Sequence, residues 1–513
     1  MAGKLNEKLN TPRPARAVPP TSGDTEVGAI ALLLLLMNDS SSSVELAATL
    51  ATEIDPLPAG SRIPTHRELV RRFEVSATTV SQALALLTQR GLVESRPGAG
   101  TFRTATRPAP AVGDTSWQEA ALAPTPGIDH GARSFGGAAM LGTLSSPGPE
   151  VADLNGGYLH PDLQPIGSLG SALARAARRP AAWDRPPVGG LPELRDWFAA
   201  DIGGGLGRHD VLVCGAGQGA MGTVLRALGQ PGDPVIVETP TYPGTIAAVH
   251  ATGLRPIPVP IDTHGPVPEY LEEAVARTRA RIIVTQPLFQ NPTGACTTPQ
   301  RQRELLRIAR SHGAFIVEDD YARHMRHTDT PTLPPPLIAD DPDGVVIHIR
   351  SLTKVTSPNL RVGGLAARGP VMARLRAAHI IDTMFVPAPL QFTALEVVTA
   401  PAWRRNLATL AAALTHRRTV AVDAVREVFG PHALPLRPRG GYHLWLRLPA
   451  HLEAGQFAAA ALSAGVALTP GTSYSPSGEP SPHLRISYVA TPSAADIGDA
   501  IRRLRPLLAG ELT

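Results

Sequence analysis

The spacing of apolar and polar positions divides this chain of 513 residues into four segments. Residues 1–28 show no apolar period and are rich in Pro, Thr and Gly, which predicts a disordered arm. Residues 29–104 have a helical period followed by short alternating runs and predict a compact unit. Residues 105–150 are rich in Pro, Gly, Ala and Ser and predict a linker. Residues 151–513 alternate between β-branched runs and helical periods, and we expect a large domain there.

Two helices and a hairpin are predicted in the N-terminal unit. The helices are expected to begin after Thr65 and after Ser76, because both side chains can cap a helix N-terminus. The second helix spans 77–89, with apolar residues at helical spacing, and Gly91 ends it. The following residues, 92–103, predict a β-hairpin with a Gly-rich tip. This arrangement is typical of a winged helix-turn-helix, whose second helix enters the major groove of double-stranded DNA.

Short strands alternate with helices in the large domain. β-branched runs predict strands at 210–215, 234–239, 280–286, 314–320 and 344–350. Helical periods such as that at 299–313 separate them, which favours an α/β fold with a mainly parallel sheet sandwiched by helices. A long helical period at 404–430 and short strands at 442–448 and 483–489 predict a small α+β subdomain, about 390–513.

Composition narrows the setting but assigns no function. The chain has 48 Lys plus Arg and 44 Asp plus Glu, and its net charge of +4 is too small to indicate a nucleic-acid partner by itself. Its two cysteines, Cys214 and Cys296, form neither a disulfide framework nor a metal-binding cluster, so we expect a reducing compartment and no metal site. The apolar run at 29–37 is too short to span a bilayer and is interpreted as the start of a helix. We therefore expect a cytoplasmic protein without a membrane segment.

Lysine is almost absent from the chain, since only Lys4, Lys8 and Lys354 occur. A deprotonated ε-amine forms a Schiff base with an aldehyde, whereas the guanidinium of arginine stays protonated and does not. The single internal lysine, Lys354, is therefore a candidate for binding pyridoxal 5′-phosphate (PLP). Ser351 and Arg361, three residues before it and seven after, offer a hydroxyl and a guanidinium for the phosphate.

Further candidate residues follow predicted strands, where α/β sheets place their ligands. Asp319 is suited to pair with the pyridine nitrogen of PLP and to keep it protonated. Asn291 is suited to donate to the phenolic oxygen of the cofactor, and Tyr321 to share this role. Gly217 and Gln218 open a predicted helix, where backbone amides face an anion.

Sixteen positions of the N-terminal unit match a known pattern. They are Pro64, Arg67, Glu68, Leu69, Val75, Ser76, Thr78, Thr79, Val80, Leu87, Gly91, Leu92, Gly98, Gly100, Thr101 and Phe102. Through them the unit resembles the GntR family of bacterial regulators. The resemblance implies DNA contacts by Arg67, Ser76, Thr78 and Thr79, and by the wing backbone near Gly98. Ala77 departs from the pattern, because the family usually has an arginine there.

Three motifs of the large domain also match a known order and spacing. They are N-P-T-G at 291–294, D-D-Y at 319–321, and S-x-x-K at 351–354 followed by an arginine seven residues later. Through them the domain resembles fold-type I aminotransferases of the aspartate aminotransferase superfamily. The resemblance implies that Tyr242 stacks on the PLP ring and that Arg485 holds a substrate carboxylate. The tyrosine that usually reaches the phosphate from the partner subunit has no clear equivalent in residues 183–190.

A GntR-like unit joined to an aminotransferase-like domain resembles the MocR family of PLP-dependent transcription regulators. The resemblance implies a head-to-tail homodimer, in which PLP or an amino-acid-like effector modulates binding to double-stranded DNA. We therefore predict a regulator. The alternative is an enzyme, an aminotransferase with an appended winged-helix domain, in which Lys354 moves the α-proton and Asp319 supports the carbanion. A third possibility is that PLP is absent and the large domain serves only for dimerisation.

Overall fold

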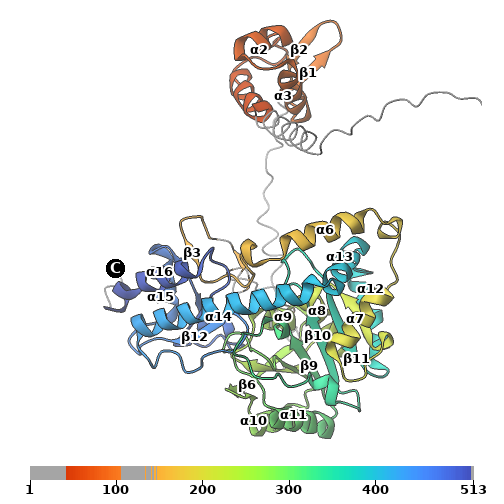
Figure 1. Ribbon diagram of the computed structural model, residues 1–513, viewed down its shortest axis with the longest axis vertical. Helices are drawn as coiled ribbons and strands as arrows, with labels where there is room; N and C mark the ends of the chain where they lie inside the picture. Colours follow the sequence, from red (N-terminus) through yellow and green to blue (C-terminus); the bar gives the residue numbers. More distant parts are fainter. Residues whose placement is uncertain are drawn as a thin grey trace, which may run out of the picture. The chain divides into compact units, whose positions relative to one another are not determined.

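The computed structural model describes residues 42–104, 133, 140, 142, 144, 145 and 147–509. The predicted arm at 1–28, the helix start expected at 29–37 and most of the linker predicted at 105–150 lie outside these residues. The chain divides into two compact units, Met1–Ala123 and Pro124–Thr513 (Figure 1). Each unit has a hydrophobic core of its own.

The N-terminal unit has the helices and the hairpin that the sequence predicts. Its elements are a helical stretch at 42–54, α2 (His66–Phe73), α3 (Ala77–Gln89), β1 (Val93–Arg96) and β2 (Gly100–Arg103). Thr65 and Ser76 cap α2 and α3, each accepting a hydrogen bond from a backbone amide of the first turn. Leu69 of α2 packs in the core with Val80 and Leu87 of α3, and all three are fully buried. The prediction of a winged helix-turn-helix is therefore confirmed.

An eight-stranded sheet forms the centre of the large unit. Its strands are β4 (Val211–Cys214), β5 (Pro234–Thr239), β6 (Arg255–Asp262), β7 (Gly265–Pro266), β8 (Ile282–Thr285), β9 (Phe315–Asp320), β10 (Val346–Ser351) and β11 (Gly363–Ala367). Their order across the sheet is β4-β11-β10-β9-β8-β5-β6-β7. β11 runs antiparallel to both of its neighbours and β7 runs antiparallel to β6, whereas the other neighbouring pairs are parallel. The five predicted strands all lie in this sheet, which confirms the α/β prediction.

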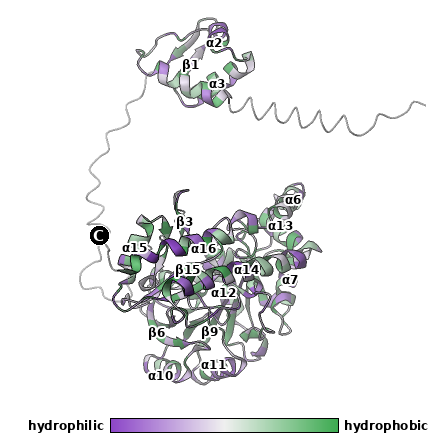
Figure 2. Cartoon of the chain, turned by 60° about the vertical axis from the view of Figure 1, so that its left-hand side comes forward, coloured by the Kyte–Doolittle hydropathy of each residue, from purple (hydrophilic) through white to green (hydrophobic). Residues whose placement is uncertain are grey.

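Helices cover both faces of the sheet (Figure 1). The helices that precede the small subdomain are α6 (Ile166–Ala177), α7 (Pro192–Ile202), α8 (Ala216–Leu228), α9 (Pro243–Ala251), α10 (Pro268–Thr278), α11 (Pro299–His312), α12 (Val371–Thr383) and α13 (Ala388–Thr399). Of these, α6 and α13 pack against each other. Because successive strand residues point to opposite faces, Ile236 packs in one buried cluster while Val235 and Val237 pack in the other. Hydrophilic residues predominate along α11 (Figure 2). Among the described residues, no helix combines the length and apolarity needed to traverse a bilayer.

A small α+β subdomain follows the sheet in the chain. It contains the helices α14 (Ala402–Phe429), α15 (Ala454–Ser463) and α16 (Ala494–Arg503) and the antiparallel strands β12 (His443–Arg447), β14 (Thr469–Pro470) and β15 (His483–Ser487). A further short strand, β13 (Val466–Ala467), pairs in parallel with β3 (Ala152–Asp153). The subdomain therefore includes residues from the beginning of the large unit as well as from its end.

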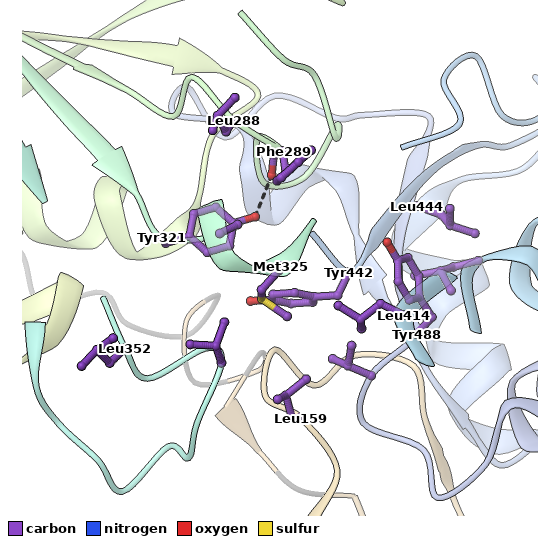
Figure 3. Close-up of a cluster of buried hydrophobic side chains, with 14 of the residues drawn as sticks. Leu159, Leu288, Phe289, Tyr321, Met325, Leu352, Leu414, Tyr442, Leu444 and Tyr488 are labelled. Carbon is purple, nitrogen blue, oxygen red and sulfur yellow. Dashed lines mark hydrogen bonds between the residues drawn. The ribbon is translucent and has the colours of Figure 1, made fainter. Parts of the chain in front are cut away.

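A buried cluster joins the subdomain to the sheet (Figure 3). The hydroxyl of Tyr321, directly after β9, donates a hydrogen bond of 2.7 Å to the carbonyl oxygen of Phe289. The ring of Tyr442, just before β12, meets the Tyr321 ring edge-on, with 6.3 Å between their centroids. Leu414 of α14 belongs to the same cluster. These contacts pack the residues that follow β8 and β9 against the hydrophobic core of the subdomain.

Candidate functional site

A cavity of about 350 Å³ lies where the parallel strands of the sheet end. All nine residues predicted to bind the cofactor line it: Gly217, Gln218, Tyr242, Asn291, Asp319, Tyr321, Ser351, Lys354 and Arg361. They come from segments up to 144 residues apart in sequence, from 217 to 361, and the order of the strands brings them together. This position is the one at which open α/β sheets bind ligands.

The Lys354 amine is partly buried and lies among aromatic rings. Its Nζ donates a hydrogen bond of 2.8 Å to the carbonyl oxygen of Gly157 and lies 4.0 Å from the centroid of the Tyr158 ring. Burial, and then the charges of Arg485 and Arg361, lower the pKa of the Lys354 amine to about 7. Near neutral pH a large fraction of this amine is therefore uncharged, which is the form that attacks an aldehyde.

Asp319 is a buried carboxylate on the cavity wall. Its Oδ2 accepts a hydrogen bond of 2.7 Å from Nε2 of Gln286, whose Oε1 in turn accepts one of 3.0 Å from the backbone amide of Asn291. Burial, together with the charge of Asp320, raises the pKa of Asp319 to about 6. A cation placed against Asp319 would favour its ionised form, so the carboxylate is suited to hold a protonated ring nitrogen.

Two further side chains offer groups to a ligand ring. The Oδ1 atom of Asn291 is buried and has no hydrogen-bond partner among the described residues. Because an amide can rotate to exchange its oxygen and nitrogen, Asn291 can present a donor or an acceptor at this position. The partly buried Tyr242 ring lies against Gly244, where any side chain would collide with it. The Tyr321 hydroxyl proton is already donated to Phe289, so this hydroxyl is left as an acceptor.

The groups expected to bind a phosphate lie at the start of α8 and around Lys354. Gly217 and Gln218 belong to the first turn of α8, whose backbone amides have no partner within the helix. Ser351 ends β10, and its Oγ accepts a hydrogen bond of 3.3 Å from the backbone amide of Thr353. The exposed guanidinium of Arg361 donates to the carbonyl oxygen of Gly215 at 3.4 Å, directly before α8. The arrangement provides backbone donors, hydroxyls and one cation for an anion.

Arg485 does not line this cavity with the other predicted residues. It lies on β15, buried, with its Nη2 donating to the carbonyl oxygen of Asn155. Its Nε has no hydrogen-bond partner among the described residues, and its guanidinium lies 5.6 Å from the centroid of the Tyr474 ring. The charge of Arg485 nevertheless acts on the amine of Lys354, whose pKa it helps to lower.

Three buried groups of a kind that binds metals gather in the sheet. Ligand-type atoms of Glu318, Asp320 and His348 lie within 4.8 Å of one another. Nδ1 of His348 lies 2.7 Å from Oε2 of Glu318, and Asp320 forms ion pairs with Arg350 and Arg323. These ion pairs and hydrogen bonds connect the three groups to their neighbours, while Oδ1 of Asp320 and Nε2 of His348 have no hydrogen-bond partner among the described residues.

The predicted DNA-contacting residues lie on α2, at the start of α3 and at the tip of the hairpin. Arg67, Ser76, Thr78 and Gly98 are exposed. Thr79 is different, because it is 2% exposed and its hydroxyl lies 2.8 Å from that of Ser76. The two hydroxyls together complete the N-terminal cap of α3, so the structure does not present the Thr79 side chain at the surface.

Each of the two predicted domains of the chain matches a known protein family. Residues 158–504 match the family model of aminotransferase class I and II. The chain belongs to this family. Residues 44–102 match the model of the bacterial regulatory proteins of the gntR family. A GntR-type domain therefore precedes an aminotransferase class I and II domain, and this is the combination predicted from the resemblance to MocR-type regulators.

Individual relatives of the family span most of the chain. It is 26% identical over 457 residues to the uncharacterized HTH-type transcriptional regulator YdfD of Bacillus subtilis, covering 87% of this chain and 92% of YdfD. It is 30% identical over 368 residues to 2-aminoadipate transaminase of Thermus thermophilus, covering 71% of this chain and 91% of that enzyme. The crystal structure of LysN, the α-aminoadipate aminotransferase of Thermus thermophilus complexed with N-(5′-phosphopyridoxyl)-L-leucine, is 28% identical, with a TM-score of 0.69 over 77% of this chain and 98% of LysN.

Several residues of this aminotransferase-family cavity were not predicted from the sequence. They include Met140, Leu144, Tyr158, Thr245, Gln286, Thr353 and Tyr442. Thr353 directly precedes Lys354, and Gln286 directly follows the strand at 282–285. The sequence positions of both residues therefore indicate that they lie near the site. Tyr158 has no such signal, because it reaches Lys354 from a segment 196 residues earlier in the chain.

Proposed function

We propose that this chain is a PLP-dependent, DNA-binding transcription regulator that acts in the cytoplasm, where an amino compound or PLP bound at Lys354 modulates binding to double-stranded DNA. One observation carries this proposal: a GntR-type domain and a cavity built around a solitary internal lysine occur in the same chain. The match to YdfD, which is named as an HTH-type transcriptional regulator, covers 87% of this chain and 92% of YdfD. The aminotransferase domain would then serve as the ligand-binding part.

The residues around the cavity fit PLP. When bound, PLP supplies an aldehyde that condenses with amines and a pyridine ring that withdraws electrons. Lys354 would hold it through an amine whose pKa of about 7 leaves much of it uncharged. Asp319 would hold the ring nitrogen, and the unpartnered amide of Asn291 would reach the phenolic oxygen. Ser351 and Arg361, with the amides that begin α8, would bind the phosphate.

The remaining residues of the site would orient the ligand. Tyr242, supported by Gly244, would cover one face of the cofactor ring and limit access of water. Tyr158 would keep the Lys354 amine over its ring, so that the amine stays close to the ligand when it accepts or returns a proton. Arg485 would bind a carboxylate after exchanging its present acceptor, the carbonyl oxygen of Asn155.

The segment that leads to the N-terminal domain offers a route for communication. Met140 and Leu144, from the range predicted as a linker, line the cavity. The backbone of this segment is held by Asn155, whose Nδ2 donates a hydrogen bond of 2.5 Å to the carbonyl oxygen of Gly142. An occupant of the cavity that contacts these side chains would favour one arrangement of the segment over another. We propose this segment as the element that transmits the state of the cavity.

A head-to-tail homodimer is part of the proposal. Large apolar side chains are exposed on and near α6 and α12: Ile166, Leu173, Trp183, Val188, Ile381 and Met384. Exposed apolar groups of this size favour a protein interface. A second copy packed there would bury them and would supply the phosphate contact for which residues 183–190 offer no clear equivalent.

The second candidate function is that of an aminotransferase with an appended winged-helix domain. The observation that favours it is the pairing of the Lys354 amine, whose pKa is lowered to about 7, with the buried carboxylate Asp319 in an aminotransferase-family cavity. The third possibility, a dimerisation scaffold without PLP, predicts a colourless purified protein.

A gel shift separates the first two functions. The probe is the DNA upstream of the protein's own gene, tested with and without PLP, and an unrelated DNA of equal length is the control. Binding to the upstream DNA alone, with an affinity that changes on addition of PLP, supports the regulator. No specific binding, together with rapid turnover of an amino donor, would overturn it in favour of the enzyme.

A further inference from the structure

A second cavity of the large unit, which shares no residue with the one around Lys354, lies between η4 (Arg323–Met325) and the first half of α14. It has a volume of about 390 Å³. Its lining residues are Arg323, His324, Arg326, Leu333, Arg404, Leu407, Ala408 and Ala411. Three arginines and a histidine therefore line this cavity, and no carboxylate does.

The arginines of this cavity have unused donors. The guanidinium groups of Arg326 and Arg404 form no hydrogen bond or ion pair with any residue that the structure describes, and both residues are exposed. The Nη2 atom of Arg323 is buried and likewise has no acceptor within the described chain. Buried polar groups without partners cost free energy, so an acceptor is expected at this position.

Ion pairs hold two of the lining residues, Arg323 and His324, in place. Arg323 pairs with Asp320, and His324 Nε2 lies 3.2 Å from Oδ2 of Asp201. Arg350 joins the two carboxylates, at 3.2 Å from Asp201 and 3.3 Å from Asp320. Arg323, Arg350 and His324 therefore lie against the charges of these two acids, and neither acid lines the cavity. The side chains of Arg323 and His324 are therefore preorganised, which lowers the entropy lost when a ligand binds.

Part of the cavity lining is apolar. Leu407 and Ala411, one helical turn apart on α14, contribute to this part together with Leu333. Guanidinium groups bind phosphates and carboxylates through paired donors, and the apolar part of the lining suits a hydrocarbon body. We propose that this cavity binds a small organic anion, with its phosphate or carboxylate head group on Arg323, Arg326 and Arg404 and its apolar body against α14. This site is additional to the proposed function and does not depend on it.

Calorimetric titration of the full chain, previously saturated with PLP, tests the proposal. Phenyl phosphate and benzoate are the probes, because they share a ring and differ in head group, and benzamide is the neutral control. We expect saturable binding of at least one anion and none of benzamide. Arg404→Ala and Arg326→Ala should each weaken binding at least about tenfold, since each removes a charge-assisted contact.

One further variant serves as a control for the site of binding. Arg405→Ala removes an exposed arginine next to Arg404 that does not line the cavity, and it should bind the probes as the unaltered chain does. The proposal is overturned if neither anion binds, if benzamide binds equally well, or if Arg405→Ala weakens binding as much as Arg404→Ala. Tighter binding of phenyl phosphate supports a phosphate ligand, and tighter or equal binding of benzoate supports a carboxylate.

Discussion

The amine of Lys354 lies 4.0 Å from the centre of the Tyr158 ring, and the two residues come from segments 196 positions apart in the chain. The ring shields the amine from water on one side, and the neighbouring carbonyl oxygen of Gly157 accepts its hydrogen bond at 2.8 Å. Burial and two nearby arginines then favour the uncharged amine. The site therefore holds a nucleophile that is ready to react near neutral pH.

The first prediction concerns the pH dependence of cofactor attachment. The pKa of Lys354 is lowered to about 7, so the uncharged fraction of the amine increases as the pH rises through that value. The rate at which added PLP acquires its protein-bound absorbance should rise from about pH 6 to about pH 8 and then level off, as followed by stopped-flow absorbance. An unperturbed lysine would give a rate that still rises near pH 10. Such a continued rise would contradict the assignment of the pKa to this amine.

The second prediction concerns Asp319. Asp319→Asn keeps the size of the side chain and the acceptor for Gln286 but removes the charge that would hold a protonated ring nitrogen. We expect PLP to bind at least about tenfold more weakly in a spectrophotometric titration. Asp343→Asn, at an exposed acid of the same unit, is the matched control and should not change the titration. Unaltered PLP binding and effector response in Asp319→Asn would exclude this role.

The third prediction concerns Arg67. This exposed residue of α2 has no partner within the described residues that would compete for a phosphate. Arg67→Ala should weaken DNA binding and reduce the slope of log affinity against log salt concentration by about 1. The measurement is fluorescence anisotropy at several salt concentrations. Arg303→Ala, an equal charge change at an exposed position of α11, should leave the slope as it is. An equal effect of both substitutions would show that only net charge matters.

The fourth prediction separates Thr78 from Thr79. Thr78 is exposed, whereas Thr79 is buried with its hydroxyl 2.8 Å from that of Ser76. Thr79→Val should lower the free energy of unfolding of the N-terminal unit by about 1 kcal/mol, because the hydroxyl that supports the cap is lost. Thr78→Ala should weaken DNA binding and leave thermal unfolding nearly unchanged. The opposite pattern of effects would show that Thr79 contacts DNA and that Thr78 is structural.

Much of the fold follows from local pattern, and the exceptions have physical reasons. The strands of the sheet centre are β-branched and buried on both faces, so their runs are visible in the sequence. The sequence of β6 does not show a strand pattern, because it carries a proline at every second position from 256 to 260, and proline is depleted in strands. β11 begins with two glycines, and Gly364 is required where the Phe198 ring packs against the sheet. Close packing, and not strand propensity, determines that segment.

The candidate site is predictable where a motif lies at or shortly after the C-terminal end of a strand. Asp319 is the penultimate residue of β9, Lys354 follows β10 and Asn291 follows β8, and the three residues share one cavity. Arg485 was predicted from a short motif, and its present acceptor, the carbonyl oxygen of Asn155, depends on a contact between segments 330 residues apart. Such long-range contacts leave no periodic signal in the sequence.

Reduction with borohydride followed by peptide mapping tests the central claim most directly. The protein is incubated with PLP, reduced and digested, and the phosphopyridoxyl group is located by mass spectrometry. Lys8→Arg is the control for the other lysines, and Lys354→Arg removes the proposed attachment site. We predict one modified peptide, containing Lys354, in the unaltered chain and in Lys8→Arg, and none in Lys354→Arg. Modification at another position, or its persistence in Lys354→Arg, would contradict the account.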